Sequence, residues 1–354
     1  MRLIQSTNLR EPSYAEMERA LGYQSEQLYL PDGVPPDKVQ MIKVPNTRKS
    51  TPGIDAWIRD EWHRKVEAAA RKYNENGVKI DVKYKDGRPN AICEVMDDGR
   101  QVVRMFDGRR ARFEGAEHDT ESGNVRILWS EDNYSTHDAL RGSGLPKPYQ
   151  AQLYTINGAV ICRYEGSPAV IIGERDPLRT DQGKIPLFVP AGFVDTKHIA
   201  GEQYAQNVGE ATINRLLAEL DIPGTHSANS PFDQVNREGL EELNAGRFDP
   251  TNMVMLSNIY NSHANHDTTA IVRVPIDSDF SDIKLRGQEH LRMFPVPLKY
   301  ETLVNFLYEL SKNLNNNSGH LRGGIASLIA HEYMFSAYKQ ALEDVAISLS
   351  RIGK

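Results

Sequence analysis

The sequence predicts an α+β or α/β chain made of two or three folding units. Three observations predict it: a stretch of helical periodicity near the N-terminus, a run of period-two alternation behind it, and a later series of strands closed by helices. The length of 354 residues agrees with that number of units.

The first unit is predicted to be an α+β unit over residues 1–145. Residues 1–52 are rich in proline and turns, which indicates short helices and extended arms. Apolar residues then recur at helical spacing over residues 55–73. Alternating stretches follow at 78–84, 92–96, 102–106 and 125–129, and Asp-Gly pairs at 86, 98 and 107 separate the first ones. Because Asp-Gly favours tight hairpins, these stretches predict a β-meander packed on the helix.

The second unit is predicted over residues 146–311, after a polar Gly-Ser-Gly boundary. Strands are expected at 152–164, 169–174 and 185–189, followed by a helix at 202–220. Residues 223–247 are rich in turn formers and are predicted to be a loop. Further strands are expected at 253–260, 269–274 and 293–296, with a helix at 300–310.

The last unit is a helical extension over residues 312–354. One long helix is predicted at 321–352, and an apolar stripe runs along it through Ile325, Leu328, Ile329, Phe335, Leu342, Val345 and Leu349. Such a stripe either packs in the core of its own chain or forms a homo-oligomer interface.

Composition excludes some classes of function. The net charge of −6 at pH 7 rules out a global basic field and so argues against nucleic acid or an anionic membrane as partner. The mean hydropathy is −0.54, and no apolar run approaches the length needed to cross a bilayer. The N-terminus is polar and predicts no signal peptide. Cys93 and Cys162 lack metal-binding spacing and are predicted to be buried free thiols, which indicates a cytoplasmic protein.

The order of elements around Pro190-Ala191-Gly192-Phe193-Val194-Asp195 resembles the Nudix superfamily over residues 148–310. The resemblance implies a three-layer α/β/α sandwich that contains the Nudix box, G-x5-E-x7-R-E-U-x-E-E-x-G-U, where U is a bulky aliphatic residue. Residues 190–195 are similar to the opening loop of the box. Residues 210–222 look like its helix.

The resemblance also implies a chemistry. Nudix enzymes hydrolyse a diphosphate linked to a nucleoside or a similar group, and they use Mg²⁺ or Mn²⁺, which prefer oxygen ligands. Glutamates at i, i+3 and i+4 lie on one helix face and bind the ions. In the helix at 210–222 these positions hold Arg215, Ala218 and Glu219, so two of the three carboxylates are missing.

The rest of that alignment also departs from the box. Asn214 takes the place of the arginine that orients a glutamate, and Asp221 takes the place of the late glycine. Glu202, the residue similar to the glutamate in the loop, comes four positions too late after Gly192. The box is therefore predicted to be degenerate.

Three functions remain open. A degenerate Nudix domain would recognise a nucleotide-like or phosphate-bearing ligand, or a protein partner, without a cofactor. The ligand-binding residues would be Arg215, Arg175, Arg179, Gly192 and Phe193. A metal-dependent hydrolase would hold Mg²⁺ or Mn²⁺ on Glu219, Glu202 and Glu210, with Glu219 and Glu289 as catalytic residues. A structural subunit would use the C-terminal helix to form an oligomer.

Overall fold

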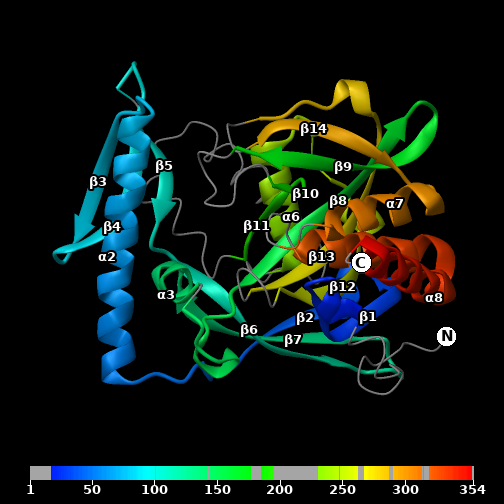
Figure 1. Cartoon of the computed structure of the whole chain (residues 1–354), viewed down its shortest axis with the longest axis horizontal. Coiled ribbons are helices and arrows are strands. Elements are labelled where there is room, and N and C mark those ends of the chain that lie inside the picture. The colour runs from blue at the N-terminus through cyan, green and yellow to red at the C-terminus, as the bar shows by residue number, and fades with distance from the viewer. Residues whose placement is uncertain are drawn as a thin grey trace.

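A central mixed sheet organises the computed structural model of the chain (Figure 1). The structure describes residues 17–99, 101–141, 143–176, 185–194, 230–246, 248–261, 267–286, 290–312, 314 and 319–352. Within these residues the sheet has the strand order β1-β12-β13-β8-β9-β10, with β11 beside β8 and β14 beside β9. The pair β13–β8 is parallel and the other pairs are antiparallel. The strands are β1 (Gln24–Val34), β8 (Tyr154–Tyr164), β9 (Ser167–Arg175), β10 (Pro186–Phe188), β11 (Ala191–Phe193), β12 (Val254–Tyr260), β13 (Thr268–Asp279) and β14 (His290–Pro297).

Each face of this sheet is covered by its own layer, as the alternation along β8 shows. Ala159 and Ile161 join the core beneath α7 (Tyr300–Ser311) and α8 (Gly319–Ile352). Val160 and Cys162 point the other way, into the core beneath α6 (Pro231–Glu242) and a second sheet. Period-two alternation of this kind places successive side chains on opposite faces. The α/β/α sandwich predicted from the sequence is therefore present.

One helix and the three strands that follow it project from the sandwich (Figure 1). The helix, α2 (Pro52–Glu75), is capped by Thr51, whose side chain accepts a hydrogen bond from the Ile54 N–H. Trp62 and Val66 pack against Ile92 of a three-stranded sheet. That sheet contains β3 (Ile80–Lys85), β4 (Arg88–Val95) and β5 (Gln101–Phe106). The predicted helix and the first three predicted strands are confirmed.

The predicted meander is wrong beyond β5, because the chain changes sheets there. β6 (Arg109–His118) pairs with β7 (Val125–Asn133), and β7 pairs in parallel with β2 (Val39–Lys43). Asp107-Gly108 is not a hairpin turn, although its composition predicts one. The Asp107 carboxylate instead accepts a hydrogen bond from the Ser135 N–H at 2.9 Å, and the Gly108 carbonyl accepts one from the Tyr134 N–H at 3.0 Å. These bonds hold the start of a short helix that the sequence analysis did not predict, α3 (Tyr134–Leu140).

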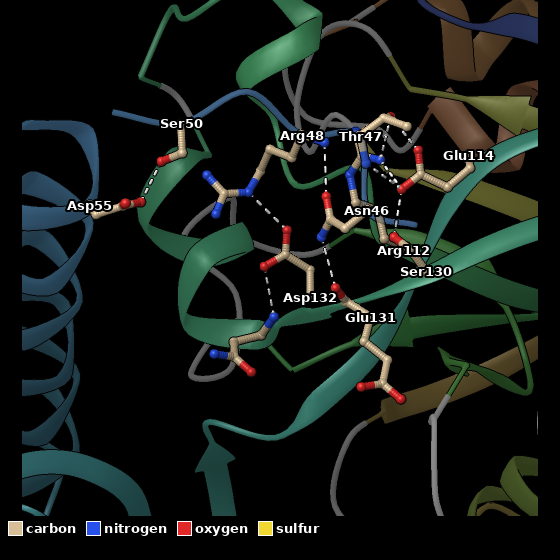
Figure 2. Close-up of polar contacts among 11 residues, drawn as sticks. Asn46, Thr47, Arg48, Ser50, Asp55, Arg112, Glu114, Ser130, Glu131 and Asp132 are labelled. Carbon is tan, nitrogen blue, oxygen red and sulfur yellow. Dashed lines mark hydrogen bonds and ion pairs between the residues drawn. The ribbon is translucent and has the colours of Figure 1, made fainter. Parts of the chain in front are cut away.

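A buried carboxylate fastens the segment between β2 and α2 onto the second sheet (Figure 2). Glu114 accepts hydrogen bonds from the Thr47 N–H (3.2 Å), the Thr47 hydroxyl (2.5 Å) and the Ser130 hydroxyl (2.5 Å), and it pairs with Arg112. Burial opposes ionisation, but the bonds from Arg112, Ser130 and Thr47 outweigh it and lower the pKa of Glu114. The network fixes β6, whose first residues reach the candidate site described below.

Contacts cross both domain boundaries that the sequence predicted. β1 pairs with β12 of the central sheet, and Leu21 and Tyr23 lie in the core under α8. The apolar stripe of α8 contributes Ile325, Leu328, Ile329, Leu342 and Val345 to the same core, so much of it is buried within the chain. α8 is also interrupted at Met334, which has φ 70°. The division into units and the homo-oligomer stay predictions.

Two smaller expectations can be compared with the described residues. Cys93 and Cys162 are free and buried, as predicted. In the part of the chain that the structure describes, no helix is both long enough and apolar enough to span a bilayer.

Candidate functional site

The residues predicted to bind a ligand are only partly within the described structure. Arg175 ends β9, and Gly192 and Phe193 lie in β11. The other six predicted residues lie outside the described residues, as do the helix expected at 202–220 and the segment that holds Glu289. These six are Arg179, Glu202, Glu210, Arg215, Glu219 and Glu289.

A helix occupies the segment predicted to be a loop at 223–247, and this prediction is wrong for the residues of α6. Ser230 caps the helix by accepting a hydrogen bond from the Phe232 N–H, and Pro231 occupies the first helical position. Phe232, Val235 and Leu240 are buried. Capping and an apolar face at helical spacing therefore outweigh the turn formers Asn236 and Gly239.

α6 packs directly on β11 and the residues on either side of it (190–194). This segment is called the Gly192 loop below, because it is similar to the opening loop of the box. A Cβ at position 192 would overlap the Glu238 carboxylate in its present position, so the Glu238 side chain lies directly against Gly192. The N–H of Ala191 donates a hydrogen bond to Glu242 Oε2 at 3.2 Å. The helix and the loop thus form one site, and two carboxylates of α6 lie against the loop backbone.

Each of three carboxylates on α6 has a protein partner. Glu238 Oε1 accepts a hydrogen bond from Gln234 at 2.7 Å. Glu241 Oε1 accepts one from Arg237 Nε at 3.2 Å. Glu242 Oε2 lies 3.4 Å from His290 Nε2, and both of these side chains are buried.

The hexad Arg237-Glu238-Gly239-Leu240-Glu241-Glu242 matches the R-E-U-x-E-E core of the Nudix box in five of its six positions. The hexad was not predicted as the box from the sequence, since Arg237 lies 45 residues after Gly192, far more than G-x5-E-x7-R allows. Gly239 stands where the box has a bulky aliphatic residue, and Asn244 stands where it has its late glycine. The three glutamates at i, i+3 and i+4 directly after an arginine were the signal that could have revealed it.

The structure compensates for Gly239. A Cβ at this position would overlap the ring of Phe248, which is buried. Phe248 is held there by a hydrogen bond from its N–H to Asn236 Oδ1 at 3.0 Å. An aromatic side chain from outside the hexad therefore fills the space next to the helix.

Phe193 lies at the centre of an aromatic group beside the loop. The ring of Tyr134 meets the Phe193 ring edge-on at a centroid distance of 5.4 Å, and the ring of His137 does so at 5.8 Å. Burial raises the pKa of Tyr134 to about 12 and lowers the pKa of His137 to about 4. Arg175 is close enough to Tyr134 to act on its charge. The structure therefore places two of the predicted ligand-binding residues, Phe193 and Arg175, around one tyrosine.

His137 makes the protein's stability depend on acid. Its folded pKa of about 4 lies below its ordinary value of 6.5, so the unfolded chain binds a proton more readily between these values. The free energy of unfolding is therefore highest above pH 6.5, where His137 is neutral in both states, and it decreases as the pH falls from 6.5 toward 4. His137→Phe keeps an aromatic ring and removes the titration. When the pH is lowered from 7 to 5, the free energy of unfolding measured in urea should fall by about 2 kcal/mol more for the wild type than for this variant. Equal losses would contradict the assignment.

No family model matches the chain, and no curated protein does. Among solved structures, the chain is similar to the Nudix domain of Shewanella oneidensis NrtR complexed with ADP ribose, at 15% identity and a TM-score of 0.26, covering 44% of this chain and 80% of that one. It is also similar to a C. elegans Ap4A hydrolase in a binary complex, at 12% identity and a TM-score of 0.27, covering 50% of this chain and 98% of that one. Scores this low carry no argument about this chain.

Proposed function

We propose that the chain is a Nudix-type hydrolase that cleaves a nucleoside diphosphate linked to another group and depends on Mg²⁺ or Mn²⁺. The observation that carries the proposal is the position of the hexad: Arg237 and the three glutamates lie on a helix packed against the Gly192 loop. This proposal replaces the degenerate box at 210–222 with a nearly complete box on α6.

The donor set fits a hard divalent cation. Glu238, Glu241 and Glu242 stand at i, i+3 and i+4 and so project from one side of the helix, and carboxylate oxygens are the ligands that Mg²⁺ prefers. Among the described residues, no three acidic, histidine or cysteine side chains are gathered closely enough to hold an ion. The three carboxylates would therefore have to turn from their present partners toward one another. When bound, the cation would supply neutralisation of the diphosphate charge.

The other groups of the chain position these carboxylates. Arg237 holds Glu241 at 3.2 Å, which is the orienting role that the Nudix resemblance assigns to the box arginine. The Ala191 N–H and His290 hold Glu242 from two sides.

The proposal predicts metal-dependent turnover. Purified protein incubated with ADP-ribose and dinucleoside polyphosphates should release a mononucleotide in the presence of Mg²⁺ or Mn²⁺, and EDTA should abolish the release. Titration with Mn²⁺, followed by electron paramagnetic resonance, should show binding that is lost in a Glu238→Gln/Glu241→Gln double variant. An absence of turnover over the whole panel together with an absence of Mn²⁺ binding would overturn the proposal.

The second candidate function is recognition of a nucleotide-like ligand without hydrolysis. The observation that favours it is that each of the three glutamates of the hexad pairs with a protein group, and the described residues contain no ready cation site. This candidate predicts that a nucleotide raises the melting temperature while no product forms, with or without Mg²⁺.

A further inference from the structure

We infer that Arg110, on β6 of the N-terminal part of the chain, binds the diphosphate of the substrate at the α6 site. The inference rests on the proposed function and adds to it a residue from outside the segment that resembles a Nudix domain. It also gives the N-terminal part of the chain a role in substrate binding.

Backbone hydrogen bonds bring β6 to the site. The Ala111 N–H donates to the Val194 carbonyl at 2.8 Å, and the Phe113 N–H donates to the Gln152 carbonyl at 3.0 Å. β6 therefore runs alongside the residues that follow Phe193 and those that precede β8. Arg110, the neighbour of Ala111, comes to lie beside the Gly192 loop.

The Arg110 side chain is placed between the aromatic group and α6. Its guanidinium carbon lies 5.9 Å from the centre of the Phe193 ring, a distance typical of a cation–π contact. It is also near enough to Glu238, Tyr134 and Asp107 to interact with their charges. Glu238 in turn touches Gly192. Arg110 thus lies within electrostatic range of one of the carboxylates that the proposed function assigns to the cation.

This position suits a diphosphate. A diphosphate that a cation joins to the α6 carboxylates keeps further negative charge, and Arg110 is the cation that lies within electrostatic range of Glu238 from β6. A guanidinium stays charged at every physiological pH, and its planar fork matches two phosphate oxygens. Glu238 and Asp107 balance its charge while the site is empty. Stacking on Phe193 limits the motion of the side chain, which lowers the entropy lost on binding.

Arg109 provides a matched control. It is the neighbour of Arg110 on β6, its side chain is 66% exposed, and it pairs with Glu131 at 3.2 Å. Successive residues of a strand point to opposite sides, so Arg109 faces away from the site. An Arg109 variant carries the same change of net charge as an Arg110 variant.

The test measures the affinity for α,β-methylene-ADP, which carries a non-hydrolysable diphosphate, by titration calorimetry in Mg²⁺. Adenosine serves as the phosphate-free probe. Arg110→Met should weaken binding of the diphosphate probe by about 10- to 100-fold, as expected for the loss of charge-assisted hydrogen bonds. It should leave the binding of adenosine within about twofold, and Arg109→Met should leave both within about twofold. Arg110→Lys keeps the positive charge but lacks the two parallel N–H donors of the guanidinium, so it should weaken diphosphate binding by about tenfold. This variant is used in place of Arg110→Met if Arg110→Met does not fold.

The possible outcomes separate this inference from the proposed function. If the wild type hydrolyses the substrate panel while Arg110→Met and Arg110→Lys bind the diphosphate probe normally, the inference about Arg110 is wrong and the proposed function stands. If Arg110→Met weakens adenosine and the diphosphate probe equally, Arg110 is structural and the inference is also overturned. If the wild type neither hydrolyses the panel nor binds the diphosphate probe, the proposed function fails and the inference falls with it.

Discussion

Glu241→Gln is expected to lower kcat/KM for a diphosphate substrate by at least about 100-fold while leaving the fold intact. The substitution keeps the size of the side chain and removes one of the three carboxylates proposed to hold the cation, whose stabilisation of the transition-state charge is worth several kcal/mol. Glu241 suits this test better than Glu242, because its side chain is 36% exposed whereas that of Glu242 is buried. The free energy of unfolding, measured in urea, should change by no more than about 0.5 kcal/mol, as is usual for surface substitutions. Steady-state kinetics in Mg²⁺ would measure the effect.

Glu219→Gln is the matched control, because it makes the same chemical change at the residue that the sequence alone placed in the box helix. It is expected to leave kcat/KM within about threefold. The opposite result, with activity lost at Glu219 and kept at Glu241, would return the box to residues 210–222 and contradict the assignment to α6. Parallel assays of both variants therefore decide between the two positions of the box.

Much of the fold could be predicted from the sequence because its signals are local. The helix at 52–75 follows from Trp62 and Val66 at helical spacing and from its Thr51 cap, and the strands around β8 follow from their apolar runs. The change of sheets after β5 could not be predicted, since Asp107 is held by the Ser135 N–H of α3, a distant part of the chain. A local turn signal gives way when a long-range hydrogen bond holds the same residues in another arrangement.

The candidate site was harder to predict, for two physical reasons. The spacing of a motif is informative only where no segment separates its parts, and here a long stretch lies between Gly192 and Arg237. Gly239 also weakened the helical signal of the hexad, because glycine costs about 1 kcal/mol in a helix relative to alanine. Arg110 lies on a different sheet, and only the pairing of β6 with Val194 brings it to the loop. Sequence patterns do not contain that information.

The ring of Phe248 takes the space that a side chain at position 239 would occupy, and this packing predicts a strong coupling between the two residues. Gly239→Leu should destabilise the protein by about 1–3 kcal/mol, because its side chain would overlap the Phe248 ring. Phe248→Ala should cost about 3–5 kcal/mol through the cavity that it leaves.

The double variant Gly239→Leu/Phe248→Ala should be more stable than the sum of the two single effects predicts, by about 1–3 kcal/mol, since the new leucine fills part of the cavity. Gly53→Leu is the matched control, because Gly53 lies in the first turn of α2 and its Cβ position would meet only the Thr51 Oγ1, at 4.0 Å. The free energy of unfolding should change there by no more than about 0.5 kcal/mol. Urea unfolding of the wild type and the four variants gives all these values. Strict additivity would show that Phe248 does not replace the missing aliphatic side chain. A positive coupling would show that Phe248 fills the space beside α6 that a larger side chain at position 239 would otherwise fill.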